Sequence, residues 1–141
     1  GADHVILYTE TDFEEGVKTI MNGKGLQVVY DSVGLTTFEK SLNVLAMRGM
    51  MVLYGQSSGP VEPFSPQTLN AKGSLYLTRP SLFHYIASRE EFVKRASDVF
   101  SMIQGKKLNV HIGETFPLDA AGEAQSRLES RTTSGKILLL P

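Results

Sequence analysis

The sequence predicts an α/β protein organised around a parallel sheet, and two similar stretches carry this prediction. The first, residues 25–34, is a short apolar run that ends in Asp-Ser-Val-Gly. Its β-branched and aromatic side chains are typical of a strand that is covered on both faces. The second, residues 50–59, is another apolar run, and it opens onto the small, polar loop Gly-Gln-Ser-Ser-Gly. A helix expected over residues 36–46 joins them into a strand-helix-strand unit, whose crossover is almost always right-handed.

Two helices carry the signature of a capping box, in which two side chains satisfy backbone amides of the first turn. Thr36 and Glu39 have this spacing, and so do Ser88 and Glu91. Apolar residues at helical spacing follow the second pair as far as Ile103, which predicts a strongly amphipathic helix that ends at Gly105.

The remaining elements follow from local patterns in the sequence. The apolar run over residues 5–7 predicts a short strand, and the proline-rich segment after residue 59 predicts a rim loop with one helical turn over 68–71. The alternating strand from Gly73 to Thr78 favours an edge or half-buried position in the sheet. The other expected elements are a helix from Phe13 that stops at Asn22-Gly23, a strand over 110–116, a helix over 118–130 and a strand over 136–140.

Composition limits the classes of function. The net charge is −1, with both signs scattered along the chain, so neither nucleic acid nor an anionic membrane is an expected partner. The absence of cysteine excludes disulfides and thiolate metal sites and suits a cytoplasmic protein. The three histidines lack metal-ligand spacing, and no apolar run approaches the roughly 20 residues of a membrane helix. A cytoplasmic, metal-free protein is therefore expected.

Four segments of the sequence resemble the NADPH:quinone oxidoreductases, the zinc-free, zeta-crystallin-like branch of the medium-chain dehydrogenase/reductase superfamily. They are Tyr30-Asp-Ser-Val-Gly34, Tyr54-Gly-Gln-Ser-Ser-Gly59, Gly73-Ser-Leu-Tyr-Leu-Thr-Arg-Pro80, and Leu128-Glu-Ser-Arg131 to Gly135. The similarity covers nearly the whole chain in order, and it implies the C-terminal part of such an enzyme.

The resemblance also implies how the chain is organised. Residues 1–109 would form part of a Rossmann-type nucleotide-binding domain and supply strands 3 to 6 of its doubly wound parallel sheet. Residues 110–141 would form a strand-helix-strand segment that returns to the catalytic domain. The catalytic domain and the glycine-rich loop of the family have no counterpart here. We therefore expect strand 3, over residues 5–7, to lack a partner, and the isolated chain to rearrange or to pair with another copy.

The family's cofactor is NADPH, and the resemblance assigns contacts to it. Tyr8 would lie near the adenine ribose and its 2′-phosphate, and Ser32 on the adenosine side. Arg131 resembles an arginine that reaches the phosphates. The nicotinamide half would meet two clusters, which are Tyr54, Gly55, Gln56 and Ser57 after one strand, and Leu77, Thr78 and Arg79 after another. Asp31 and Gly34 are interpreted as structural, and no residue of this chain is assigned a catalytic role.

The resemblance implies an NADPH-dependent quinone reductase that transfers hydride to a quinone or another conjugated carbonyl. The partial chain alone is expected to be inactive. A homodimer is also implied, formed by antiparallel pairing of the strand from Gly73 to Thr78. Two alternatives stay open, another zinc-free reductase (enoyl reductase or alcohol dehydrogenase-like) and a non-catalytic nucleotide-binding module; a methyltransferase-like domain is a weaker third. Tyr8 alone does not decide between NADPH and NADH.

Overall fold

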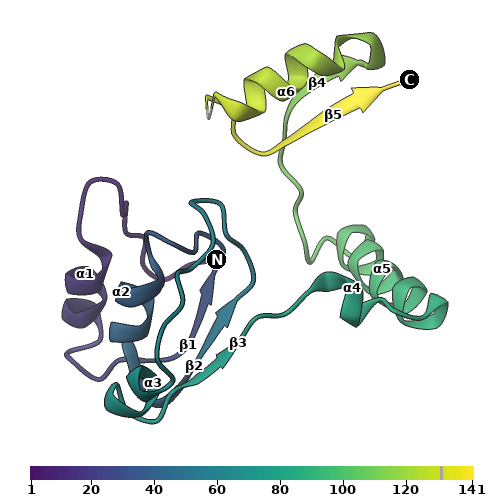
Figure 1. Ribbon diagram of the computed structural model, residues 1–141. Coiled ribbons are helices and arrows are strands. Elements are labelled where there is room, and N and C mark those ends of the chain that lie inside the picture. The colour runs from purple at the N-terminus through teal and green to yellow at the C-terminus, as the bar shows by residue number, and fades with distance from the viewer. Residues whose placement is uncertain (131) are drawn as a thin grey trace. The chain divides into compact units, whose positions relative to one another are not determined.

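The computed structural model describes residues 1–130 and 132–141, which form two compact units, residues 1–84 and residues 85–141 (Figure 1). Each unit is described by itself below. The division expected after residue 109 remains a prediction.

The first unit is a three-stranded parallel sheet with helices on one side (Figure 1). The strand order is β1-β2-β3, so β3 is an edge strand, as the alternating pattern indicates. The register places Val28, Met50 and Tyr76 side by side across the three strands. The elements are α1 (Phe13–Ile20), β1 (Leu26–Asp31), α2 (Phe38–Asn43), β2 (Leu45–Leu53), α3 (Gln67–Ala71) and β3 (Tyr76–Thr78).

The core of this unit lies between the sheet and the helices α2 and α3. Leu42 of α2 and Met51 of β2 are almost completely buried, and Phe38 stacks at a tilt on Phe64 with ring centroids 5.0 Å apart. On the other face of the sheet, Tyr30 is 73% exposed. The prediction that the strand at residues 26–30 is covered on both faces is therefore wrong for this chain. Within residues 1–84, all of which the structure describes, the helices cover only one face.

Three local predictions for the first unit are also wrong, each for a tertiary reason. Residues 5–7 form no strand, because no neighbouring strand offers them a hydrogen-bonding ladder. The helix expected over residues 36–46 is shorter, because Leu45 and Ala46 already belong to β2, where Leu45 pairs with Leu26 of β1. The helix cap is Thr37 rather than Thr36, and it makes no side-chain hydrogen bond to the helix.

The second unit confirms the local predictions more closely. The capping box is present, since the Ser88 hydroxyl accepts from the Glu91 amide at 3.1 Å and Glu91 Oε2 accepts from the Ser88 amide at 3.4 Å. Gly105 caps the helix end, as expected. The elements are α4 (Leu82–Tyr85), which crosses the division, α5 (Arg89–Gln104), β4 (Ile112–Pro117), the 3-10 turn η1 (Leu118–Ala120), α6 (Ala121–Glu129) and β5 (Lys136–Leu140).

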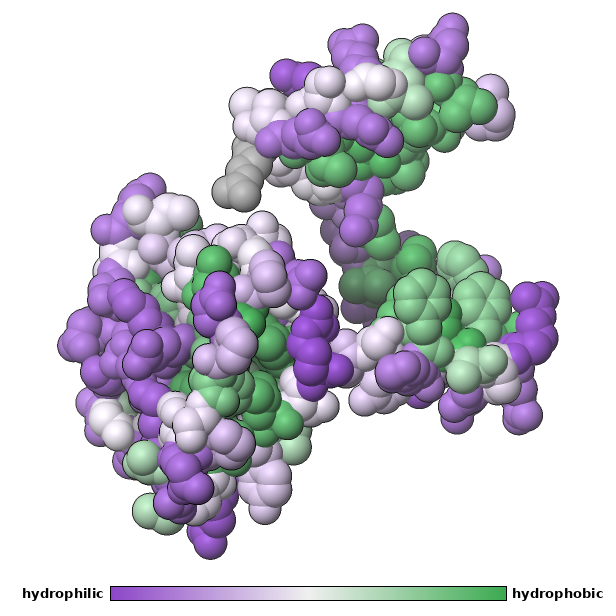
Figure 2. All heavy atoms as spheres, in the orientation of Figure 1, coloured by the Kyte–Doolittle hydropathy of each residue, from purple (hydrophilic) through white to green (hydrophobic). Residues whose placement is uncertain are grey.

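In this unit β4 and β5 form a parallel pair, and Arg127 of α6 is bidentate to Glu114 of β4, with the shorter contact at 2.8 Å. Hydrophobic side chains gather on the surface over α5, where Phe100 is 62% exposed (Figure 2). In the part of the chain that the structure describes, no helix is long and apolar enough to cross a membrane.

Candidate functional site

The loops that leave β1 and β2 are hydrogen-bonded to each other along the carboxyl edge of the sheet. The Tyr54 amide donates to the Asp31 carbonyl at 2.9 Å, and the Ser57 amide donates to the Ser32 carbonyl at 3.2 Å. The two loops therefore form one continuous crest, residues 31–34 and 54–59. Ligands of open α/β sheets bind outside this edge, so the crest is the candidate site.

Asp31 joins the two loops of the crest to α2, and the residue is only 5% exposed. Its Oδ1 accepts from the Val33 and Gly34 amides at 2.8 and 3.0 Å, and its Oδ2 accepts from the Thr37 and Ser41 hydroxyls at 2.7 and 2.8 Å. Burial raises the pKa of the carboxyl, but these hydrogen bonds outweigh burial and hold the pKa below its ordinary value. Asp31 is thus an ionised structural anchor that joins the first loop to α2.

Two glycines allow the loops to approach this closely. Gly55 crosses the first loop where a Cβ would lie 2.3 Å from the carbonyl oxygen of Ser32. Gly34 has φ +88°, and a Cβ there would lie 2.8 Å from the carbonyl oxygen of Gly59. The family resemblance places Gly55 at a point where the backbone comes close to the cofactor. In the structure, the lack of a side chain at Gly55 is already needed for the contact between the two loops.

The two predicted nicotinamide clusters lie next to each other. Thr78, at the end of β3, pairs in register with Val52 of β2, just before the second loop begins. Arg79 then reaches back, and its Nη2 donates to Gln56 Oε1 at 3.5 Å. The side chains of Ser57, Thr78 and Arg79 are exposed at this edge, as is that of Tyr54. Leu77 differs, because its side chain packs against the core.

Tyr8 and Ser32 also come together, at the start of the crest. Both line an open depression of about 250 Å³, with Phe13 and Tyr30 among its other walls. Tyr8 is 54% exposed and lies in the turn that leads to α1. Arg131, the remaining predicted cofactor contact, lies outside the residues that the structure describes.

Two polar residues that hold the crest together were missed by the sequence analysis. The Ser58 hydroxyl accepts from the Thr36 amide at 3.1 Å and donates to the Val33 carbonyl at 2.8 Å, so it ties the loops together. Thr37 is the N-cap residue of α2, but its hydroxyl donates to Asp31 instead of bonding a backbone amide of the helix. The pairs Thr36-Thr37 and Ser57-Ser58 are visible in the sequence. Neither pair by itself indicates which of its two hydroxyls faces inward.

Comparison with known proteins places this geometry in a family. Residues 1–139 match the family described as zinc-binding dehydrogenase. The chain belongs to this family. One curated relative is Quinone oxidoreductase 1 of Escherichia coli strain K12, which is 48% identical to this chain over 143 residues. The match covers all of this chain and 44% of that protein, so the chain spans less than half the length of this relative.

Two further relatives are informative. The 2-haloacrylate reductase of a Burkholderia species is 41% identical over 142 residues, which cover all of this chain and 43% of that protein. The crystal structure of Escherichia coli quinone oxidoreductase complexed with NADPH is 47% identical and matches with a TM-score of 0.92, covering all of this chain and 44% of that one. These matches confirm the resemblance to quinone oxidoreductases and the α/β fold class.

The family description raises the question of zinc, and the residues that the structure describes do not by themselves form a zinc site. Among residues 1–130 and 132–141, no three His, Asp or Glu side chains lie close enough together to hold a metal ion, and the sequence contains no cysteine. Zinc in proteins is held by three or four such ligands. The crest instead offers the exposed serines Ser32 and Ser57 at the ligand-binding edge of the sheet, next to the exposed side chain of Arg79.

Proposed function

We propose that this chain is the C-terminal part of an NADPH-dependent quinone reductase, in which it supplies part of the cofactor-binding site. The observation that carries the proposal is the meeting of Gln56 with Arg79 at the carboxyl edge of the sheet. Two clusters assigned to one cofactor from separate segments lie side by side there. The 47% identity to a quinone oxidoreductase crystallised with NADPH supports the same cofactor.

When bound, NADPH supplies the hydride that reduces a quinone or another conjugated carbonyl. The chain's own part is to hold and orient the dinucleotide. Backbone of the segment Tyr54, Gly55, Gln56 and Ser57 would lie against the nicotinamide ribose, and backbone at Leu77 and Thr78 would face the carboxamide. Arg79 would donate hydrogen bonds to the cofactor. Only its Nη2 donates to Gln56, so other N–H groups of the guanidinium stay available.

Tyr8 and Ser32 would take the adenosine side of NADPH, where hydroxyl groups can donate to the ribose and its phosphate. Their shared depression supports this assignment. Arg131 would reach the phosphates. We further propose a zinc-free, cytoplasmic homodimer that pairs through the strand from Gly73 to Thr78. The edge position of β3 supports such pairing, because among the described strands it has a neighbour on one side only.

A second candidate is reduction of a conjugated carboxylic acid or thioester, within the reductase alternatives that the sequence leaves open. The 41% identity to a 2-haloacrylate reductase favours it specifically. The two candidates share the cofactor and the crest. Parallel assays of the complete protein with a benzoquinone, 2-chloroacrylate and an enoyl thioester distinguish them. If the protein is a non-catalytic nucleotide-binding module, it is expected to bind NADPH and to turn over none of these three substrates.

The binding proposal is tested by titrating NADPH into the complete protein and into the 141-residue chain while following nicotinamide fluorescence, with NADH as the comparison. Arg79→Gln is expected to raise the dissociation constant of NADPH for the complete protein by about tenfold, which is the usual effect of losing a hydrogen bond to a charged group. Arg48→Gln is the matched control, because Arg48 lies on β2 before the crest. An equal effect of both substitutions would argue against the crest as the site.

A further inference from the structure

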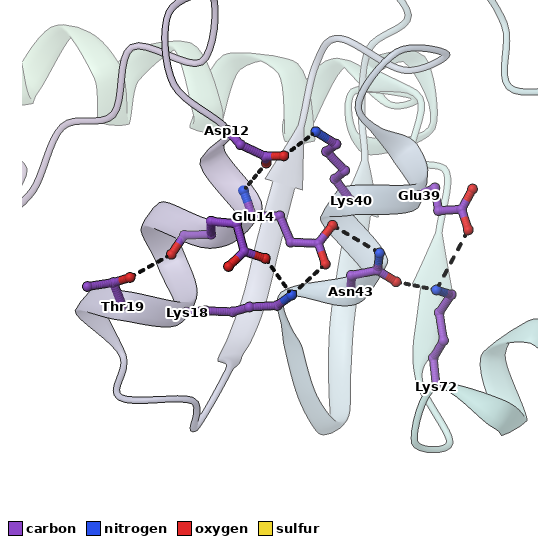
Figure 3. A network of polar contacts seen from close by, with 9 residues as sticks. Asp12, Glu14, Lys18, Thr19, Glu39, Lys40, Asn43 and Lys72 are labelled. Carbon is purple, nitrogen blue, oxygen red and sulfur yellow. Dashed lines mark hydrogen bonds and ion pairs between the residues drawn. The ribbon is translucent and has the colours of Figure 1, made fainter.

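A single aspartate links the helix α1 to the helix α2 in the first unit. Asp12 caps α1, and its Oδ1 accepts from the Glu14 amide at 2.9 Å. Its Oδ2 accepts from Nζ of Lys40, on α2, at 2.8 Å (Figure 3). A helix cap requires only the contact with the Glu14 amide. The contact with Lys40 joins residues 28 positions apart and therefore helps to hold the two helices together.

A second link lies beside the first (Figure 3). Glu14 Oε2 accepts from the Asn43 amide group at 3.0 Å, and Glu14 Oε1 pairs with Lys18 at 2.8 Å. Asn43 in turn accepts from Lys72. Asp12 and Glu14 are thus joined to α2 at positions three residues apart, which fixes the first turn of α1 against that helix.

The first turn of α1 is also the end of the turn that carries Tyr8. The Glu10 and Thr11 amides both donate to the Leu7 carbonyl at 2.9 Å, so residues 7–11 form a tight turn that runs directly into Asp12. Residues 5–7, on the other side of this turn, belong to no strand. The position of Tyr8 therefore depends strongly on where Asp12 is held.

Lys40 lies on α2, the helix that is anchored to the Ser32 side of the depression. The helix α2 begins after Thr37, whose hydroxyl donates to Asp31 at 2.7 Å, and Asp31 directly precedes Ser32. The Asp12–Lys40 pair consequently joins the segment that carries Tyr8 to the helix anchored below Ser32. Neither Asp12 nor Lys40 is among the described residues that line the depression. The pair can therefore affect the shape of the depression only by positioning the residues that do line it.

We propose that the Asp12–Lys40 ion pair is a positioning element that holds Tyr8 beside Ser32 and so sets the fit of the ribose-phosphate side of the dinucleotide. This inference rests on the proposed function, because it gives the depression a ligand. Asp12 is ionised at neutral pH, since the hydrogen bond from Lys40, followed by that from the Glu14 amide, lowers its pKa.

A double-substitution cycle in the complete protein tests this role. Lys40→Met removes the ion pair and leaves the cap of α1 intact. It is expected to raise the dissociation constant of NADPH by about two- to fivefold, a range typical of loss of an exposed pair. In the Tyr8→Phe background the same substitution is expected to have little effect, because the hydroxyl that it positions is already gone. Lys40→Arg keeps the charge and is expected to restore binding.

Glu15→Gln is the matched control. It removes the pair of Glu15 with Lys18, which lies within α1 and does not reach α2. NADPH affinity is expected to be unchanged. Equal effects of Lys40→Met in the two Tyr8 backgrounds, or no effect in either, would overturn the positioning role while leaving NADPH binding by the crest standing. Failure of the unsubstituted protein to bind NADPH would overturn the proposed function together with this inference.

Discussion

The main chain of Gly55 crosses that of Ser32 so closely that a Cβ on Gly55 would lie 2.3 Å from the Ser32 carbonyl oxygen and 2.7 Å from its Cα. Both contacts are with backbone, which cannot rotate away as a side chain can. The joined crest of the candidate site therefore depends on a glycine at this one position.

Gly55→Ala is expected to destabilise the first unit by about 1–3 kcal/mol, the usual cost of forcing an extra methyl group into a packed place. It is also expected to weaken NADPH binding by the complete protein, because the two loops must separate. Urea unfolding and fluorescence titration measure the two effects.

The matched control is Gly16→Ala on α1. Its Cβ would contact only the Ile6 side chain, and the one short contact, at 2.8 Å, is with the terminal Cδ1 atom, which can move. Alanine also favours a helix over glycine by about 0.5–1 kcal/mol. A neutral or slightly stabilising result is expected for Gly16→Ala, and equal destabilisation by both substitutions would contradict the crossing as the cause.

Asp31→Ala is expected to lower the free energy of unfolding by about 3 kcal/mol or more, because it leaves buried donors of α2 and of the first loop without an acceptor. Asp31→Asn should cost less. Its oxygen can still accept from the two backbone amides, while the hydroxyls of Thr37 and Ser41 can turn to accept from its amide group. Equal loss in the two variants would argue against the hydrogen bonds as the source of the stability.

The ionised Asp31 should also make stability depend on pH. Its pKa in the folded chain lies below the ordinary value of 3.8. Its charge therefore stabilises the fold fully above that ordinary value, and this stabilisation is lost as the pH falls toward the folded pKa. Unfolding measured from pH 7 to pH 2 should show a steeper loss below pH 4 in the unsubstituted chain than in Asp31→Asn. Parallel curves would contradict this assignment.

Exposed apolar side chains on the open sheet face should make the 141-residue chain associate with itself. Val28, Tyr30 and Tyr76 are 43%, 73% and 59% exposed. Such a face, next to the unpaired edge of β1, favours contact with another copy. Sedimentation equilibrium is expected to give an average mass above the 15.5 kDa of one chain, rising with concentration.

Tyr30→Lys should reduce this association, because it places a charge on the open face. Thr19→Lys is the control, since it adds the same charge at an exposed position of α1. A monomer with sharp two-state unfolding at every concentration would contradict both the association and the expectation of rearrangement or pairing that the sequence raised.

Predictions from the sequence succeeded where the interactions concerned are local. The capping box of Ser88 with Glu91 and the stop at Gly105 involve residues within a few positions of one another. The helix that begins at Phe13 and the strand that ends at Asp31 likewise follow from short-range patterns. These interactions depend mainly on spacing along the chain, so the order of elements could be predicted without the fold.

Tertiary contacts decided the rest. Residues 5–7 have strand-like composition but remain irregular, because a strand needs a neighbour and composition does not supply one. Thr37 caps α2 without a hydrogen bond to the helix, since the buried carboxylate of Asp31 takes its hydroxyl. The candidate site shows the same division. Glycines and hydroxyls in the exit loops are visible in the sequence, whereas the contact of Gln56 with Arg79 joins residues 23 apart and exists only because parallel strands end at one edge.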